Sequence, residues 1–121
     1  MNLTETNRQI ALNWIAAFND HSLERLLALY DEDARHFSPK LKIRIPETGG
    51  WISGKATLET WWADAFNRLP SLQYQLHNLL VTDEQVLMEY LRKVDGEADM
   101  MVAEVLEIGQ GRIQKSRVYH G

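Results

Sequence analysis

The stretch that decides the fold runs from Ala11 to Pro39, ALNWIAAFNDHSLERLLALYDEDARHFSP. Its first half, together with the preceding Ile10, carries an apolar face at helical spacing, formed by Ile10, Trp14, Ala17 and Phe18. This period predicts a helix from about Thr4 to Asn19. After a polar break, Ser22 is suited to cap a second helix. That helix has an apolar stripe made of Leu23, Leu26, Leu27 and Tyr30. Two helices joined by so short a turn must fold back on each other.

The pattern becomes extended after the second helix. Asp31 to Asp33 ends the helical period, and the chain reads as extended from Ala34. Over residues 40–45, leucine and isoleucine alternate with lysine and arginine, which predicts a half-buried strand. A turn over residues 46–50 and a short return strand over residues 51–53 follow.

A third helix and a run of strands complete the expected elements. The helix is predicted from about Lys55 to Arg68, because its apolar positions recur at helical spacing and Pro70 ends it. Strand patterns then cover residues 72–77, 85–94, 99–108 and 112–119. The dipeptide Asp95-Gly96 favours a tight antiparallel hairpin. Helices first and consecutive hairpins later predict an α+β fold, with helices on one face of an antiparallel sheet.

Composition limits the classes of function. The 121 residues are expected to form one domain, residues 1–121, with 45% hydrophobic and 25% charged residues. The formal net charge of −4 argues against nucleic acid or an anionic membrane as a partner, because both require a basic surface. The chain has no cysteine, no apolar run of membrane-spanning length and no signal-like start. We therefore expect a cytoplasmic protein.

The order of elements resembles that of the nuclear-transport-factor-2-like superfamily, which includes ketosteroid isomerase, polyketide cyclases and limonene epoxide hydrolase. The motifs that carry the resemblance are WIAAFN (14–19), LYDEDA (29–34), Ser38-Pro39, the helix after Gly54, and GRI (111–113) leading into RVY (117–119). The resemblance spans essentially the whole chain. It implies a cone, in which a curved sheet wraps around three helices and the open end holds a small apolar ligand.

Ketosteroid isomerase's catalytic positions can be compared one at a time with this chain. Trp14 stands where that enzyme has its oxyanion-binding tyrosine, and Ser38 stands in place of its general base. A serine alone cannot act as a base near neutral pH. Glu104 is the nearest match to the acid that an apolar site keeps protonated, and Trp62 corresponds to a supporting tyrosine. Steroid-isomerase chemistry is therefore not expected.

Strand alternation extends this comparison to a candidate pocket. If Ser38 and Glu104 face inward, their neighbours two residues away along each strand do so too. The expected pocket residues are Trp14, Tyr30, His36, Ser38, Trp62, Glu104 and His120. Within it, His36 and Glu104 are the candidate catalytic residues and the other five are candidate ligand contacts. No ligand spacing such as His-x-x-x-His is present, so neither a metal nor another cofactor is expected.

Two interpretations of the catalytic candidates remain open. In the first, burial raises the pKa of Glu104 towards neutrality, His36 titrates in the same range, and the two form an acid–base pair. In the second, His36 is a core histidine bonded to a backbone group, and Glu104 pairs with Arg117 or another cation. Glu89, an alternative carboxylate, is expected to point outward.

These interpretations lead to two hypotheses of function. One is a small-molecule isomerase, cyclase or hydrolase without a cofactor. The other is a binding module for an apolar or aromatic metabolite. Outward-facing apolar residues such as Met101 and Val105 also predict a homodimer formed through the outer face of the sheet.

Overall fold

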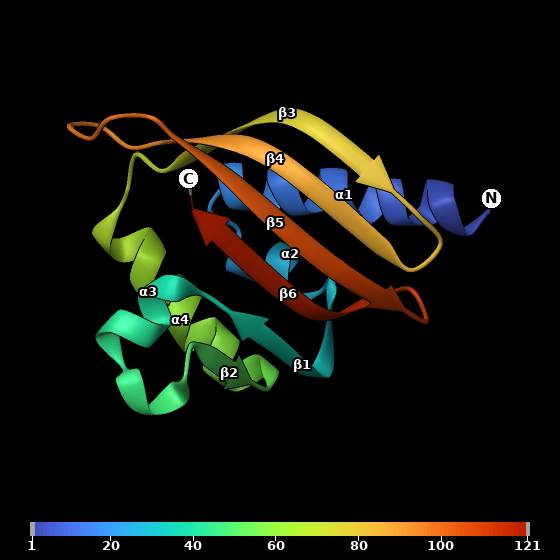
Figure 1. Ribbon diagram of the computed structural model, residues 1–121, viewed down its shortest axis with the longest axis horizontal. Helices are drawn as coiled ribbons and strands as arrows, with labels where there is room; N and C mark the ends of the chain where they lie inside the picture. The colour runs from blue at the N-terminus through green and yellow to red at the C-terminus, as the bar shows by residue number, and fades with distance from the viewer. Residues whose placement is uncertain (1, 121) are drawn as a thin grey trace.

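A six-stranded sheet organises the fold, with its strands in the order β2-β1-β6-β5-β4-β3 (Figure 1). The computed structural model describes residues 2–120. The strands are β1 Tyr30–Phe37, β2 Trp51–Ser53, β3 Gln73–Val81, β4 Gln85–Lys93, β5 Met100–Gly109 and β6 Arg112–His120. β1 and β6 run parallel, and the other neighbouring strands are antiparallel. The β1–β6 pairing brings the amino-terminal half of the chain beside its last strand.

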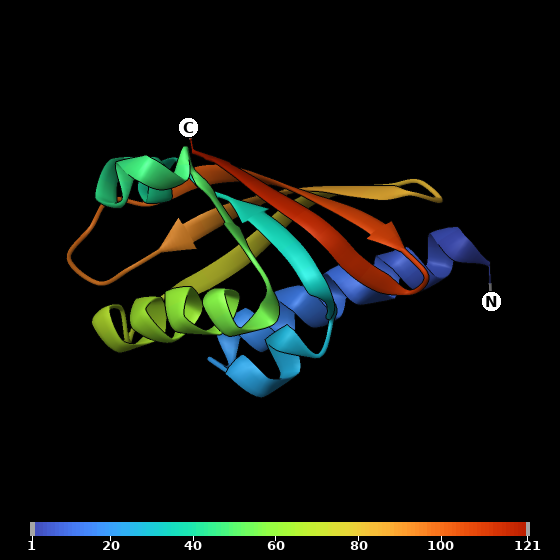
Figure 2. The same ribbon diagram turned by 90° about the horizontal axis from the view of Figure 1, so that it is seen from below.

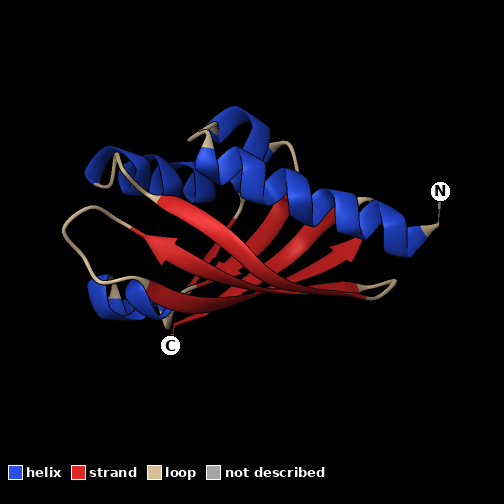
Figure 3. Cartoon of the chain, turned by 90° about the horizontal axis from the view of Figure 1, so that it is seen from above, coloured by secondary structure: helices blue, strands red, loops and turns tan. Residues whose placement is uncertain are grey.

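Three helices cover one face of this sheet. The helices are α1 Leu3–Asn19, α2 Leu23–Leu27, α3 Pro39–Arg44 and α4 Lys55–Arg68, with a 3-10 turn at Pro46–Thr48. Helices α1, α2 and α4 lie together on the concave side, whereas α3 lies apart from them, near the end of β6 (Figures 2 and 3). The three helices predicted from the sequence are α1, α2 and α4. The α+β cone is confirmed.

Local chemistry explains the helix starts and the curvature. The Asn2 side chain accepts a hydrogen bond from the Glu5 amide at 2.8 Å, and Ser22 caps α2 in the same way. Shifts of register interrupt the β1–β6, β3–β4 and β5–β6 pairings. Such irregularities bend strands and increase their twist, which gives the sheet its concave face.

The predicted strand over residues 40–45 is wrong, because this segment forms α3. Ser38 accepts a hydrogen bond from the Lys40 amide and Pro39 occupies the first turn, which together start a helix. Only Leu41 is buried in this helix, while Ile43 is 78% exposed. The alternation of apolar and basic residues thus did not correspond to two faces of a strand.

Two further boundaries differ from those predicted. Tyr30 does not continue the second helix but begins β1, so Asp31 to Asp33 lies within a strand. The Asp95-Gly96 turn is part of a longer connection, residues 94–99. The tight two-residue hairpin lies instead between β5 and β6, where Gln110 and Gly111 have φ angles of 55° and 74°. Two positive φ angles are what this type of turn requires.

The main core lies between the concave face of the sheet and helices α1 and α4. Trp14 and Phe18 from α1 pack at 4.4 Å between ring centroids, and Phe18 also meets Trp62 of α4 edge-on. Tyr90 and Met88 of β4 are fully enclosed beneath them. Across residues 2–120, none of the helices has the length and apolar character needed to cross a membrane.

Candidate functional site

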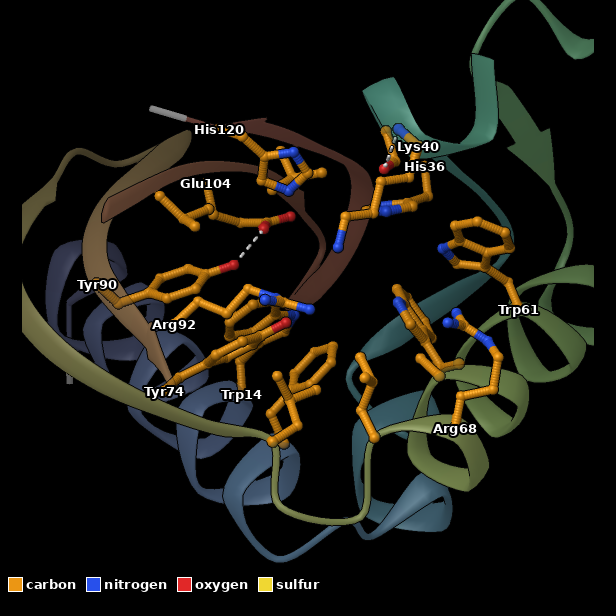
Figure 4. Close-up of a pocket in the computed structure, with 18 residues that line it drawn as sticks. Trp14, His36, Lys40, Trp61, Arg68, Tyr74, Tyr90, Arg92, Glu104 and His120 are labelled. Carbon is orange, nitrogen blue, oxygen red and sulfur yellow. Dashed lines mark hydrogen bonds between the residues drawn. The ribbon is translucent and has the colours of Figure 1, made fainter. Parts of the chain in front are cut away.

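A cavity opens between the concave sheet and the ends of α3 and α4 (Figure 4). Both long helices, α1 and α4, contribute to its lining, as does every strand of the sheet except β2. Its aromatic walls include Trp14, Trp62, Tyr74 and Tyr90, and its polar groups are His36, Ser38, Lys40, Arg68, Arg92, Glu104 and His120. The enclosed space is about 80 Å³, which is small for a ligand site. A larger ligand therefore requires the half-buried side chains at the rim to move.

The structure brings six of the seven expected pocket residues into this lining. They are Trp14, His36, Ser38, Trp62, Glu104 and His120. Tyr30 is not among the lining residues; it is completely buried and supports Trp14 and Ser116 through hydrogen bonds. Glu89 is exposed on the other face of β4, as expected.

Glu104 is the acid that reaches the cavity. It lies on β5 between the inward residues Val102 and Leu106, and only 2% of its surface is exposed. Its Oε1 accepts a hydrogen bond from the Tyr90 hydroxyl at 3.0 Å. Its Oε2 is, within residues 2–120, the one fully buried side-chain polar atom without a partner.

Burial controls the charge of this carboxyl. Desolvation raises the pKa of Glu104 to about 8, against the smaller lowering effect of the Tyr90 hydrogen bond. Glu104 is therefore mainly a neutral carboxylic acid at pH 7, as the first interpretation expected. The suggested partner Arg117 is not available to it, because Arg117 pairs with Glu107 on the opposite face of the sheet. Glu104 makes no ion pair with another described residue.

His36 ends a chain of buried hydrogen bonds. The Trp14 indole donates to the Tyr30 hydroxyl at 3.1 Å, Tyr30 donates to Ser116 Oγ at 2.9 Å, and Ser116 lies 2.7 Å from His36 Nδ1. An indole nitrogen can only donate, so the Tyr30 proton must be directed to Ser116. The Ser116 proton is then free for His36 Nδ1. When Ser116 donates this proton to Nδ1, the ring proton lies on Nε2 and His36 can donate a hydrogen bond through that nitrogen; in the other tautomer Nδ1 donates to Ser116.

This environment keeps His36 neutral. Burial lowers its pKa to about 3, so it does not titrate in the range of Glu104, and that part of the expectation is wrong. Its partner is also a serine hydroxyl and not a backbone group. Strand β6 separates β1 from β5, which places the backbones of His36 and Glu104 roughly 10 Å apart across the sheet. No hydrogen bond joins the two side chains, so they face a ligand space from different sides.

The other two polar candidates already have structural bonds. The single donor of Trp14 is taken by Tyr30, which leaves its ring to contact a ligand. The Ser38 oxygen accepts the capping bond from the Lys40 amide, although its own proton remains available. His120 is half-buried, and burial together with Lys40 and Arg92 lowers its pKa.

The sequence reasoning missed a group of cations and two tyrosines in the lining. Tyr74 and Tyr90 lie on inward positions of β3 and β4, and the strand alternation applied to the neighbours of Glu104 could have found them. Arg92 follows Tyr90 by two residues and shares its face. Lys40 was assigned to a solvated strand face, and only the helical conformation of α3 turns it towards the cavity.

The described part of the chain contains no metal-binding cluster, and its wider hollow differs in character from the first cavity. Residues 2–120 contain no set of three or more His, Asp or Glu side chains placed to hold a metal ion. A wider hollow of about 570 Å³ lies between α3 and α4, with Leu41, Ile45 and Trp61 in its wall. Its charged residues, Arg44 and Asp64, are paired with each other, so it lacks the buried unpaired groups of the first cavity.

Comparison with known proteins agrees with this architecture. A crystal structure of a SnoaL-like protein of unknown function from Burkholderia thailandensis superposes with a TM-score of 0.87; it shares 24% identity and covers 97% of this chain and 95% of its own. TerC, co-crystallised with polyporic acid, gives 0.82 at 18% identity, with 96% and 92% covered. A proposed ketosteroid isomerase from Kribbella flavida gives 0.80 at 20% identity, with 100% and 82% covered.

Comparison of the sequence with curated proteins found no match. A family model, in contrast, supports the same assignment. The profile of the SnoaL-like domain matches residues 11–116, which include the second half of α1, all of α2, the strand with His36 and the strand with Glu104. The chain belongs to the SnoaL-like domain family, within the nuclear-transport-factor-2-like superfamily.

Proposed function

We propose that this protein binds a small aromatic carbonyl compound in the cavity and moves a proton on it, with Glu104 as the group that transfers the proton. One observation carries the proposal. Glu104 is a buried carboxyl whose second oxygen has no partner, and Figure 4 shows it directed into a space walled by aromatic rings. A pKa of about 8 makes both of its protonation states accessible near neutral pH, which suits an acid–base catalyst.

The proposed step needs no cofactor. The ionised Glu104 takes a proton from the carbon next to the ligand carbonyl, and the C–H electron pair forms the enolate double bond. The His36 Nε2–H donates a hydrogen bond to the enolate oxygen. Glu104 then returns the proton to a second carbon, which completes an isomerisation. The same first step begins an aldol cyclisation, so it fits a cyclase as well as an isomerase such as the one proposed for Kribbella flavida.

The test uses 2-tetralone, an aromatic ketone with exchangeable protons next to its carbonyl. Its deuterium exchange in D₂O is followed by NMR with the protein and with two variants. Glu104→Gln is expected to lower the protein-dependent exchange by ~10²–10⁴-fold, the usual contribution of a positioned acid or base. Glu89→Gln, an equal change on the outer face of β4, should leave it unchanged. Equal exchange rates for Glu104→Gln and the unaltered protein would contradict the proposal.

A second candidate, a binding module without catalysis, is favoured by a different observation. The base position holds Ser38, whose oxygen caps α3, and His36 does not titrate near neutral pH. Glu104 therefore has no second titrating partner for relaying protons. Under this alternative, compounds that bind in the cavity undergo no exchange or conversion, either with the unaltered protein or with any variant.

We also propose that two copies pair through the outer face of the sheet. Met101 and Tyr119 are 42% and 46% exposed there, on the adjacent strands β5 and β6. A Met101→Glu variant should then shift the mass measured by light scattering from dimer to monomer. A monomeric unaltered protein at micromolar concentration would refute this pairing.

A further inference from the structure

The cavity lining is basic although the chain as a whole is acidic. The full sequence has 17 acidic and 13 basic residues, yet the lining contains three cations, Lys40, Arg68 and Arg92, and a single acid, Glu104. That acid is mainly neutral at pH 7 because its pKa is about 8. The side chains that line the cavity therefore carry a positive charge, opposite to the net charge of the protein, although Glu97 and Asp64 outside the lining pair with Arg92 and Arg68.

Arg92 is a buried cation with unused donors. Its side chain is only 6% exposed, and one terminal nitrogen donates to Glu97 at 2.8 Å. A guanidinium has five N–H donors, and no other bond from this group to a described side chain is present. Figure 4 shows the guanidinium directed into the cavity beside Tyr74 and Tyr90. Its remaining donors are available to an acceptor within the cavity.

Lys40 faces Arg92 from the other side. Its side chain extends from α3 into the cavity, and it forms no ion pair with a described residue. Burial and the neighbouring charge of Arg92 lower the pKa of Lys40. The two cations thus disfavour each other's charge, and a bound anion would relieve this repulsion. Arg68 adds less, because Asp64 already accepts from it at 2.8 Å.

We propose that the ligand of this cavity is an aromatic anion, a carboxylate or an acidic enolate, whose charge lies between Lys40 and Arg92 and whose ring packs against Trp14, Tyr74 and Tyr90. This inference rests on the proposed function, in that the same cavity is the ligand site, and it adds the charge of the ligand. A planar oxyanion matches the fork of an arginine, and the flat aromatic walls match a ring attached to it. The neutral acid Glu104 does not repel the anion and can donate its proton to a ligand oxygen.

Benzoate and benzamide test this directly, because they have nearly the same shape and differ in charge. Each is titrated into ¹⁵N-labelled protein at pH 7, and the indole N–H signals are followed. Trp14, Trp61 and Trp62 line the cavity, while Trp51 lies outside it and serves as an internal control. Benzoate is expected to shift the three cavity signals without shifting Trp51, and to bind at least ~10-fold more tightly than benzamide, as charged hydrogen bonds exceed neutral ones.

Variants in α3 test whether Lys40 causes the preference for benzoate over benzamide. Lys40→Gln should weaken benzoate binding roughly tenfold, the lower end of the range for a charged hydrogen bond, because Lys40 is half-buried. Lys42→Gln removes the same charge from the same helix outside the cavity and should leave the affinity unchanged. Arg92→Gln, which removes a buried ion pair, is interpreted only if its signals show an intact fold.

The outcomes separate this inference from the proposed function. Equal binding of benzoate and benzamide at the cavity signals would overturn the anion inference and leave the cavity as the ligand site. Equal effects of Lys40→Gln and Lys42→Gln would also overturn it. If neither compound shifts these signals, the inference fails, while the tetralone exchange assay still tests the proposed function independently.

Discussion

Replacing Glu104 by glutamine tests whether this carboxyl is buried without a charge partner. Glutamine keeps the shape of the side chain and an oxygen that can accept from Tyr90, but it cannot ionise. A carboxyl whose pKa is raised by folding favours the folded state only while it holds its proton. Its contribution to stability is complete below the unfolded pKa of 4.5 and is lost as pH rises to about 8.

The size of the effect follows from these two pKa values. Between pH 4.5 and 8 the unfolded chain releases the proton while the folded protein retains it. The free energy of unfolding should then fall by about 1.4 kcal/mol for each pH unit, or about 5 kcal/mol over the whole interval. Glu104→Gln lacks this term. The buried amide adds a cost of about 1–3 kcal/mol for its unpaired donor, but that cost does not change with pH.

Urea unfolding followed by tryptophan fluorescence measures the difference between the two proteins. It is carried out at pH 5, 6, 7 and 8 and at one protein concentration, so that any self-association is constant. The other titrating groups are common to both proteins and cancel in the difference. We expect the variant to gain stability relative to the unaltered protein at each step upward in pH. A difference that stays constant from pH 5 to 8 would show that Glu104 is ionised or solvated, and the reasoning would be refuted.

Three other perturbations probe the hydrogen-bond chain, a tight contact and the ligand charge. Ser116→Ala should cost about 1–3 kcal/mol of unfolding free energy, because the buried Tyr30 hydroxyl loses its acceptor; an unchanged urea midpoint would contradict the chain. Gly50→Ala should lower the melting temperature, since its φ is +96° and its Cβ would lie 2.5 Å from Phe37 Cε1; an unchanged melting temperature would rule out that close contact. Benzoate should raise the pKa of Glu104, measured from the ¹³C shift of its carboxyl, and an unchanged pKa would place the anion elsewhere.

The architecture was predictable where the local signal and the tertiary environment agree. The helix around Trp14, the helix ending before Pro70 and the inward faces of the late strands all show a period that matches their burial. The segment after Ser38 shows the opposite case. Its alternating residues suit a strand, but a cap and Pro39 start a helix there, and Leu41 is the residue that this helix buries. Periodicity over six residues cannot separate these outcomes.

The candidate site was predictable to the extent that it lies on strands. The resemblance to ketosteroid isomerase indicated Glu104, and the rule that alternate residues share a face extended the site to His36 and His120. Two features depend on contacts between distant segments and could not be derived in this way. The bond between Ser116 and His36 joins residues 80 positions apart and holds Nδ1 of the buried ring. Lys40 enters the cavity only because the segment after Ser38 is helical.

The neutral state of Glu104 and the basic lining depend on each other. If Glu104 were ionised at pH 7, its charge would offset that of Lys40 or Arg92, and the cavity would lose its preference for anions. The other groups near Glu104 cannot replace the lost positive charge. His36 is uncharged, and burial raises the pKa values of Tyr30, Tyr74 and Tyr90, so these tyrosines stay neutral. Desolvation of one carboxyl therefore sets two properties together. It leaves the cavity with cations that can select an anionic ligand, and it brings the pKa of Glu104 close enough to neutral pH that the ionised form, which takes the proton in the proposed reaction, is also present.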